Sequence, residues 1–225
     1  MTAPSSMYEY TVRKLGTMSD DQLKQIEVAL EKAFAEDQYT AVVTSRDREF
    51  YGTFFGSIII AGLLGGEVYV AEDVDKTIVG VAAWYGPGRA LYDSLDQQEK
   101  SLSILMQRFS HELSQWWVTD FLPKYNEFTA KALGEGQKLA SWHLQALGVD
   151  PKFQRKGIAR ALVNIMKEKA AKEETPLCVE CSVDINVGIY ERLGFEVKGQ
   201  TTLVGIPGTG EFPLWIMWQD IPKAA

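Results

Sequence analysis

Residues 142–170 constrain the fold of this chain more than any other part of the sequence. They begin with a short apolar-rich segment that ends at Asp150-Pro151, a pattern typical of a buried strand that stops at a turn. A basic turn follows. Apolar residues then recur at helical spacing, at Ile158, Leu162, Ile165 and Met166. The sequence therefore predicts a strand that leads through a small, basic turn into an amphipathic helix.

The turn at residues 154–159 has the composition of a phosphate-binding site. The first N–H groups of a helix have no partner within the helix, and the helix dipole favours an anion beside them. Gly157 lets the backbone approach a ligand closely, and Ala159 keeps the next approach unobstructed. Positive charge is added around the same point by Arg155, Lys156 and Arg160.

This run resembles motif A of the GNAT acetyltransferases, whose turn reads Gln/Arg-x-x-Gly-x-Gly/Ala. Here the turn starts at Gln154 and fills the last small position with Ala159. The resemblance implies that the turn holds the pyrophosphate of acetyl-CoA and that the preceding strand bonds the pantetheine arm through main-chain groups. The plain alternative is an ordinary strand–loop–helix joint with surface lysines. The cofactor-binding residues implied here are Leu147, Gly148, Val149, Gln154, Arg155, Lys156, Gly157, Ile158, Ala159 and Arg160.

A second run, residues 182–195, resembles motif B of the same family, in which an Asn and a Tyr four positions later open a short helix ending in Leu-Gly-Phe. Asn186 and Tyr190 stand at positions i and i+4, so a helix presents both on one face. Gly194 is a natural left-handed stop for that helix. The resemblance implies that both residues contact the cofactor and that Tyr190 is the general acid for the departing thiolate. A phenol with an ordinary pKa of about 10 is protonated at neutral pH and can donate. The alternative for Tyr190 is a packing role alone.

The sequence defines the general base less sharply. Glu180 lies on the strand after the motif A helix, Asp150 ends the motif A strand, and His143 lies on that strand. Each also fits a structural role. Glu180 fits a paired carboxylate, Asp150 a turn former, and His143 a histidine whose hydrogen bonds are satisfied. The family often uses a water relay in place of a dedicated base. Our candidate catalytic residues are Tyr190 as acid and Glu180 as base.

Periodicity along the rest of the chain predicts an α/β (α+β) fold. Alternating segments predict strands at residues 9–15, 67–72, 77–85, 177–183, 195–204 and 211–218. Apolar residues at helical spacing predict helices at residues 20–36, 46–64 and 157–172. Ser19 and Gln22 predict a capping box at the start of the first of these helices. The resemblance implies the GNAT fold, with a mixed, mostly antiparallel central sheet of about six to seven strands flanked by helices.

Residues 89–138 form a helical insertion between the predicted third and fourth strands that the core fold does not require. Leu, Met and Phe recur at helical spacing in its first half, and its second half is rich in aromatic residues. It predicts either two helices that simply pack on the sheet or an aromatic wall over the acceptor, because pockets for organic ligands are lined in this way. The candidate substrate-binding residues are Trp84, Trp116, Trp117 and His143.

Length and composition favour one soluble globular domain over residues 1–225. The net charge of −7 argues against a nucleic-acid binder, which needs a basic face. Residues 1–8 are expected to form a loose tail without a signal-peptide pattern, and the most apolar stretch, residues 57–64, is too short to span a bilayer. We therefore expect a cytoplasmic protein with no membrane partner.

The two cysteines, Cys178 and Cys181, lie on a predicted strand. Strand residues three apart face opposite sides, so we expect two reduced thiols and no disulfide between them. A zinc site would need two more ligands, and the two histidines, His111 and His143, do not form a ligand-like pair. The sequence therefore predicts no metal.

The order of these segments is similar to that of the puromycin N-acetyltransferase-like small-molecule acetyltransferases. This resemblance implies an acetyl-CoA-dependent N-acetyltransferase, monomeric or homodimeric, that acts on a primary amine of a small molecule by direct attack on the thioester. Two other functions stay open. One is acetylation of protein lysines or N-termini, and the other is a non-catalytic acyl-CoA-binding regulatory module.

Overall fold

The computed structural model describes residues 8–221, so only Tyr8 of the expected N-terminal tail falls within it. In this part of the chain seven strands form one sheet in the order β1-β2-β3-β4-β5-β7-β6. The strands are β1 (Thr11–Leu15), β2 (Glu67–Glu72), β3 (Ile78–Tyr85), β4 (Trp142–Val149), β5 (Leu177–Cys181), β6 (Glu196–Val204) and β7 (Glu211–Gln219). Only β4 and β5 pair in parallel, and every other neighbouring pair is antiparallel. The mixed, mostly antiparallel sheet is confirmed.

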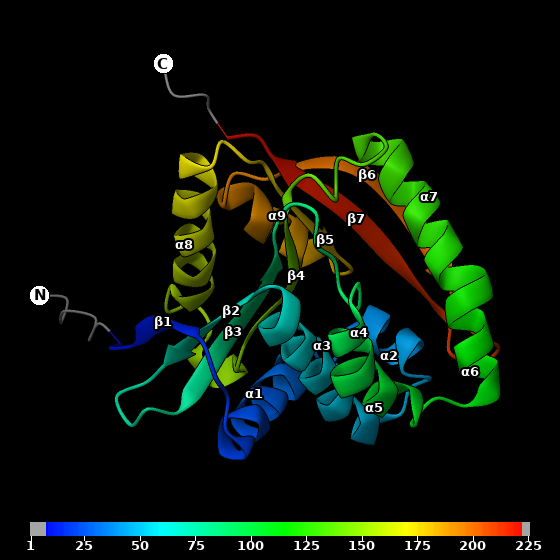
Figure 1. Ribbon diagram of the computed structural model, residues 1–225, viewed down its shortest axis with the longest axis horizontal. Helices are drawn as coiled ribbons and strands as arrows, with labels where there is room; N and C mark the ends of the chain where they lie inside the picture. Colours follow the sequence, from blue (N-terminus) through cyan, green and yellow to red (C-terminus); the bar gives the residue numbers. More distant parts are fainter. Residues whose placement is uncertain (1–7, 222–225) are drawn as a thin grey trace, which may run out of the picture.

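Helices cover both faces of this sheet (Figure 1). On one face, the apolar residues of α8 (Ile158–Lys172) and α9 (Asp184–Arg192) pack with inward-facing residues of the central strands, among them Trp84 and Met217. On the other face, a second core joins strand residues to the N-terminal helices and the insertion. The N-terminal helices are α1 (Asp20–Ala33), α2 (Gln38–Val43) and α3 (Tyr51–Gly65). None of the helices within residues 8–221 is both long and apolar enough to cross a membrane.

Local sequence explains where the two helices that flank β4 begin. Ser19 caps α1 by accepting from the N–H of Gln22 at 3.2 Å, and the Gln22 side chain accepts from the N–H of Ser19 at 3.1 Å. The predicted capping box is therefore confirmed. Helix α8 begins differently, because its N-cap is Gly157 in the left-handed conformation, with φ +86° and no side-chain cap. The free N–H groups at the start of α8 consequently face outward from a turn that only glycine adopts readily.

The insertion forms two helical segments on the same face as α1 and α3. The first runs through α4 (Leu95–Gln97), a π-helical turn (Gln98–Leu102) and α5 (Ser103–Met106). The second runs through α6 (His111–Trp116), another π-helical turn (Trp117–Phe121) and α7 (Leu122–Leu133), which lies along β6 and β7 in Figure 1. Pro123 follows the second π-turn and has no N–H to donate to the preceding turn, which favours a local departure from α-helical bonding.

Residues 46–64 depart from the single helix that the sequence predicts. The structure has the short helix α2 before them and a 3₁₀ turn (Arg48–Phe50), and α3 begins only at Tyr51. Asp47 explains the difference, because its carboxylate accepts from the N–H of Glu49 at 3.0 Å and caps the 3₁₀ turn. Helix α3 therefore enters the core as a separate element whose Phe54, Phe55 and Ile58 face the inside of the molecule.

The two cysteines lie on β5 as predicted, on opposite faces of the sheet. Cys181 belongs to the core beneath α8 and α9, whereas the Cys178 Sγ lies 3.1 Å from the Ser141 hydroxyl oxygen on the other side. Both thiols are buried and free. Burial raises the pKa of each to about 12, so neither is a thiolate at neutral pH.

Gly66 joins α3 to β2 at a point where a side chain has no room, and its substitution tests this packing. A Cβ atom there would lie 2.2 Å from the main-chain oxygen of Trp84. We expect Gly66→Ala to lower the free energy of unfolding by about 1–3 kcal/mol, because a backbone oxygen of a central strand cannot rotate away. Urea unfolding of both proteins measures this change. Gly16→Ala is the control, since a Cβ there has no described atom within 4 Å, and equal losses in both variants would contradict the assignment.

Candidate active site

The site is organised by the place where β4 and β5 separate. Their parallel pairing covers only Trp142↔Leu177, His143↔Cys178 and Leu144↔Val179. Strand β4 then continues to Val149, while β5 ends at Cys181. Beyond Leu144, the edge of β4 therefore has no β5 partner and borders an open gap.

A β-bulge at Gln145 decides which groups face this gap. Ala83 of β3 pairs with Ala146 and Trp84 pairs with Leu144, so Gln145 has no partner on β3. After the bulge, the N–H of Asp150 donates to the Val79 oxygen on β3 at 2.9 Å. Alternation along an antiparallel strand then places the N–H groups of Leu147 and Val149 on the other edge, toward the gap.

The basic turn lies at the end of this same edge. Gln154 Nε2 donates to the Val149 oxygen at 3.2 Å and so links the turn to β4. Lys156 Nζ lies 3.9 Å from the ring centroid of Tyr8, whereas the side chains of Arg155 and Arg160 are exposed. Arg155 has a φ of +61° beside the left-handed Gly157. Free helix N–H groups, cations and a strained turn thus converge on one point, which is the arrangement that suits an anion.

A cavity of about 870 Å³ runs from the gap into the insertion. Its volume falls within the range of about 300–1,000 Å³ that small-molecule sites occupy. At the gap it is lined by Leu147, Cys181, Asn186 and Tyr190. Toward the insertion its walls are aromatic and aliphatic, with contributions from Phe54, Phe55, Ile58, Leu105, Phe109, Trp117, Phe121 and Leu122.

Four polar side chains meet at the fork between β4 and β5, and Glu180 is at their centre. Tyr125 donates its hydroxyl to Glu180 Oε1 at 2.7 Å, and His143 Nε2 lies 2.6 Å from Oε2. Lys138 Nζ lies 3.1 Å from Oε1, contacts the Tyr125 hydroxyl, and lies 4.4 Å from the centroid of the Tyr125 ring. Only 11% of the Glu180 side chain is exposed.

The protonation states in this cluster follow from burial and charge. Burial lowers the pKa of His143, and this effect, with that of the neighbouring Lys138, outweighs the opposing effect of Glu180, so the imidazole is neutral. Burial by itself would raise the pKa of Glu180, but the charge of Lys138 and the hydrogen bonds from His143 and Tyr125 hold the pKa below its ordinary range. An ionised carboxylate only accepts, so the neutral imidazole donates its Nε2–H to Glu180.

These contacts bear on the base role predicted for Glu180. Both of its oxygens already accept hydrogen bonds, and a carboxylate with a lowered pKa takes up protons poorly near neutral pH. The geometry therefore favours Glu180 as a group that holds positive charge. Its role as a base stays a prediction.

The motif B helix places Tyr190 and Asn186 against the same cavity. The Tyr190 ring packs edge-on against Phe195 with centroids 5.7 Å apart, and burial raises the pKa of its hydroxyl. No hydrogen-bond partner for this hydroxyl occurs within residues 8–221. Gly194 ends the helix with φ +94°, as predicted. Tyr190 is thus a protonated, uncommitted donor beside the gap.

Two of the candidate substrate-binding residues lie elsewhere. Trp84 is fully buried in the core beneath α8, on the opposite face from the cavity. Trp116 does not line the cavity, because its indole N–H donates to the Val204 oxygen at 3.0 Å within the core. Trp117 and His143 do line it. Trp84 follows the regular alternation of β3, because Ala82 and Trp84 lie in the core on the α8 side whereas Val81 and Ala83 lie in the core on the other side.

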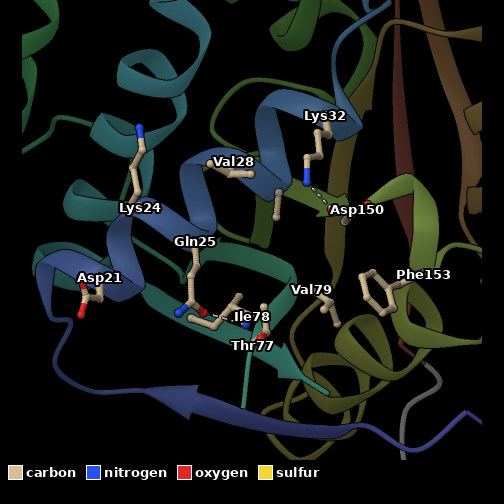
Figure 2. Close-up of a pocket in the computed structure, with 11 residues that line it drawn as sticks. Asp21, Lys24, Gln25, Val28, Lys32, Thr77, Ile78, Val79, Asp150 and Phe153 are labelled. Carbon is tan, nitrogen blue, oxygen red and sulfur yellow. Dashed lines mark hydrogen bonds and ion pairs between the residues drawn. The ribbon is translucent and has the colours of Figure 1, made fainter. Parts of the chain in front are cut away.

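Asp150, the other carboxylate considered as a base, also lies away from the cavity. It accepts from the N–H of Lys152 and from Lys32 Nζ, both at 2.9 Å. These bonds place it in a separate pocket of about 380 Å³ between α1 and β3 (Figure 2). Burial raises its pKa, but the Lys152 N–H and Lys32 lower it to below the ordinary value. Asp150 therefore serves the turn and the contact with α1.

Sequence reasoning missed Tyr125 and Lys138 as site residues. Tyr125 stands 55 positions from Glu180 in the chain, and nothing in the local pattern joins them. The available signal was a single lysine in the loop after the aromatic helix, beside Gly134 and Gly136. No group of three or more His, Cys, Asp or Glu side chains within residues 8–221 is arranged to hold a metal ion.

Comparison with known proteins agrees with the fold. Residues 128–206, which contain both motifs, match the model of the acetyltransferase (GNAT) domain. An uncharacterized N-acetyltransferase of Schizosaccharomyces pombe is 28% identical over 177 residues, which cover 76% of this chain and 70% of the relative.

Two solved structures show the same fold. Arylalkylamine N-acetyltransferase 2 from Aedes aegypti has a TM-score of 0.60 at 16% identity, covering 95% of this chain and 99% of that one. The ribosomal-protein-S18-alanine N-acetyltransferase from Escherichia coli has a TM-score of 0.51 at 16% identity, covering 96% and 97%. Residues 128–206 carry a GNAT acetyltransferase domain, and this match and the relative support a GNAT-type N-acetyltransferase.

The ionised state of Glu180 predicts how stability depends on pH. Folding lowers the pKa of Glu180. The ionised carboxylate therefore stabilises the folded state fully above the ordinary carboxyl pKa of 4.5, and this stabilisation is lost as the pH falls through the lower folded value. We expect Glu180→Gln to cost about 1–3 kcal/mol at neutral pH, because two buried donors lose their charged acceptor. The difference from wild type should shrink below about pH 4. Urea unfolding at several pH values measures both effects.

Glu127→Gln is the matched control, because Glu127 is an exposed carboxylate on the same insertion. Its stability curve should run parallel to that of wild type. A constant difference between Glu180→Gln and wild type from neutral to acid pH would contradict an ionised Glu180.

Proposed function

We propose that this enzyme transfers the acetyl group of acetyl-CoA to the primary amine of a small molecule with an apolar body. The cavity is the observation that supports this proposal. It joins the gap between β4 and β5 to a predominantly aromatic and aliphatic chamber, and its volume of about 870 Å³ suits a small organic molecule. Acetyl-CoA is the donor used by the GNAT family.

The residues at the gap fit this donor. The turn at residues 154–159 offers free helix N–H groups and exposed cations to a pyrophosphate. The unpaired edge of β4 offers main-chain groups to an amide-containing arm, in the manner of an added strand. Asn186 and Tyr190 close the other side of the gap. These are the cofactor-binding residues that we propose.

In the proposed mechanism, the protein polarises the thioester carbonyl and protonates the departing sulfur. The N–H of Leu147 faces the gap and hydrogen-bonds the thioester oxygen as it gains negative charge. The acceptor ammonium group first loses one proton to water. Its nitrogen then forms the new bond to the carbonyl carbon while the carbon–sulfur bond breaks, and the second proton that the nitrogen sheds passes through water to restore the Tyr190 hydroxyl. Tyr190 gives its proton to the departing sulfur. No covalent enzyme intermediate is required, because the amine attacks directly.

The walls of the chamber support an apolar acceptor. Residues of α3 and of the insertion face it with phenyl, indole and aliphatic groups, which bury apolar surface favourably. The Aedes aegypti protein of similar fold is an arylalkylamine N-acetyltransferase. Arylalkylamines are acceptors whose apolar bodies suit such walls. Acetylation of a peptide needs a groove that bonds an extended main chain, so we rank it second.

A panel of acceptors tests this function directly. The protein is incubated with acetyl-CoA and with arylalkylamines, long alkylamines, polyamines, amino acids and lysine or alanine peptides, and thiol release and product mass are followed. We expect arylalkyl and alkyl primary amines to give the highest kcat/KM, because only they place apolar surface in the chamber. Product from peptides alone would replace this proposal with a protein acetyltransferase.

Removal of the Tyr190 hydroxyl tests the proposed acid. We expect Tyr190→Phe to lower kcat by about 100- to 10,000-fold, the range for loss of a positioned proton donor. Acetyl-CoA affinity, measured by calorimetry, should stay nearly constant. Tyr69→Phe is the control, since Tyr69 donates to Glu67 at 2.8 Å on the opposite face of the sheet. Unchanged kcat in Tyr190→Phe would leave Tyr190 a packing residue.

A further inference from the structure

The fork between β4 and β5 contains a built binding site for a primary ammonium group, and a side chain of the protein itself occupies it. Lys138 Nζ lies 3.1 Å from Glu180 Oε1 and 4.4 Å from the centroid of the Tyr125 ring. The carboxylate oxygen and the Tyr125 hydroxyl, which Lys138 Nζ also contacts, both accept hydrogen bonds from an ammonium group. The chemical group held there is the same one that an amine N-acetyltransferase must receive.

The position of this site relative to the gap is the second observation. Glu180 directly follows Val179, the last residue of β5 that pairs with β4. The ammonium site therefore lies at the fork itself, where the gap meets the chamber. An amine bound there would have its nitrogen near the gap and its body among the apolar walls.

Lys138 is able to leave the site without movement of its backbone. Its main-chain oxygen accepts from the N–H of Ser141 at 3.2 Å and from the Ser141 hydroxyl at 2.8 Å, which fixes the loop. Its side chain is 26% exposed and reaches the cluster from the surface. Rotation about the flexible lysine stem is enough to return the ammonium group to water.

We propose that Glu180 and the hydroxyl of Tyr125 form the acceptor's ammonium subsite, and that Lys138 fills this subsite until an acceptor replaces it. This inference rests on the proposed function and names its acceptor class as apolar amines that arrive as primary ammonium ions. Lys138 acts as a tethered competitor. It also keeps Glu180 paired while no acceptor is present, which avoids an unpaired buried charge.

Competition by Lys138 has a measurable size. The apparent affinity of a ligand is reduced by the fraction of protein whose site is free. If Lys138 leaves the subsite about one-tenth of the time, removing its ammonium group strengthens amine binding by about tenfold. A neutral ligand of the same shape does not compete for the carboxylate and gains nothing.

The experiment compares binding of 2-phenylethylamine and 2-phenylethanol to CoA-saturated protein by calorimetry. We expect Lys138→Met to bind the amine about tenfold more tightly than wild type, with unchanged affinity for the alcohol. Lys124→Met is the matched control, because Lys124 lies on the same insertion, pairs with Asp120 at 2.8 Å and is outside the cavity. It should leave both affinities unchanged.

A second variant keeps the inference testable if Lys138→Met is unstable. Glu180→Gln retains Lys138 and should abolish the preference for the amine over the alcohol, and thermal unfolding of each variant verifies that it is folded. Weaker or unchanged amine binding in folded Lys138→Met would show that Lys138 is a permanent part of the site and would overturn the inference, as would absence of amine binding to every variant. Because binding is measured without turnover, a subsite that behaves as expected in a protein that acetylates no amine would reject the proposed function alone.

Discussion

The separation of β4 from β5 is the constraint on which the rest of this structure depends. Three paired residues hold the two strands together at one end, and the bulge at Gln145 turns β4 away from its neighbour beyond Leu144. Main-chain groups that would otherwise complete the sheet are left facing a gap. Such groups are costly to bury without partners, so a gap of this kind is suited to a ligand that supplies them.

The polar cluster at the fork follows from the same separation. Glu180 comes immediately after the last paired residue, and its carboxylate points into the cavity side of the sheet among apolar groups. A buried charge persists only when it is paired and hydrogen-bonded. His143 from β4, Tyr125 from α7 and Lys138 from the following loop supply these contacts. The insertion therefore both completes the apolar chamber and stabilises the charge at its entrance.

Contiguous patterns were sufficient to predict most of the elements. The Gly157 turn, the Gly194 stop and the Ser19 capping box each depend on residues within a few positions of one another, and the structure has all three. The 3₁₀ turn before α3 was missed because the Asp47 cap competes with helical periodicity. The extent of the domain and the roles of the site residues stay predictions.

What the sequence alone determined is most of the local conformations and the resemblance to the two GNAT motifs, because motif spacing and turn chemistry act over short distances. Only the tertiary structure decided which side chains share the cavity. One unpaired residue, Gln145, reverses the side of the sheet that every later residue of β4 faces, so a simple alternation count along β4 does not tell which of its residues face the cavity. Likewise, Lys138 and Tyr125 meet Glu180 only because α7 and its loop fold back over the fork. Contacts between residues distant in the chain depend on packing, which local sequence patterns do not encode.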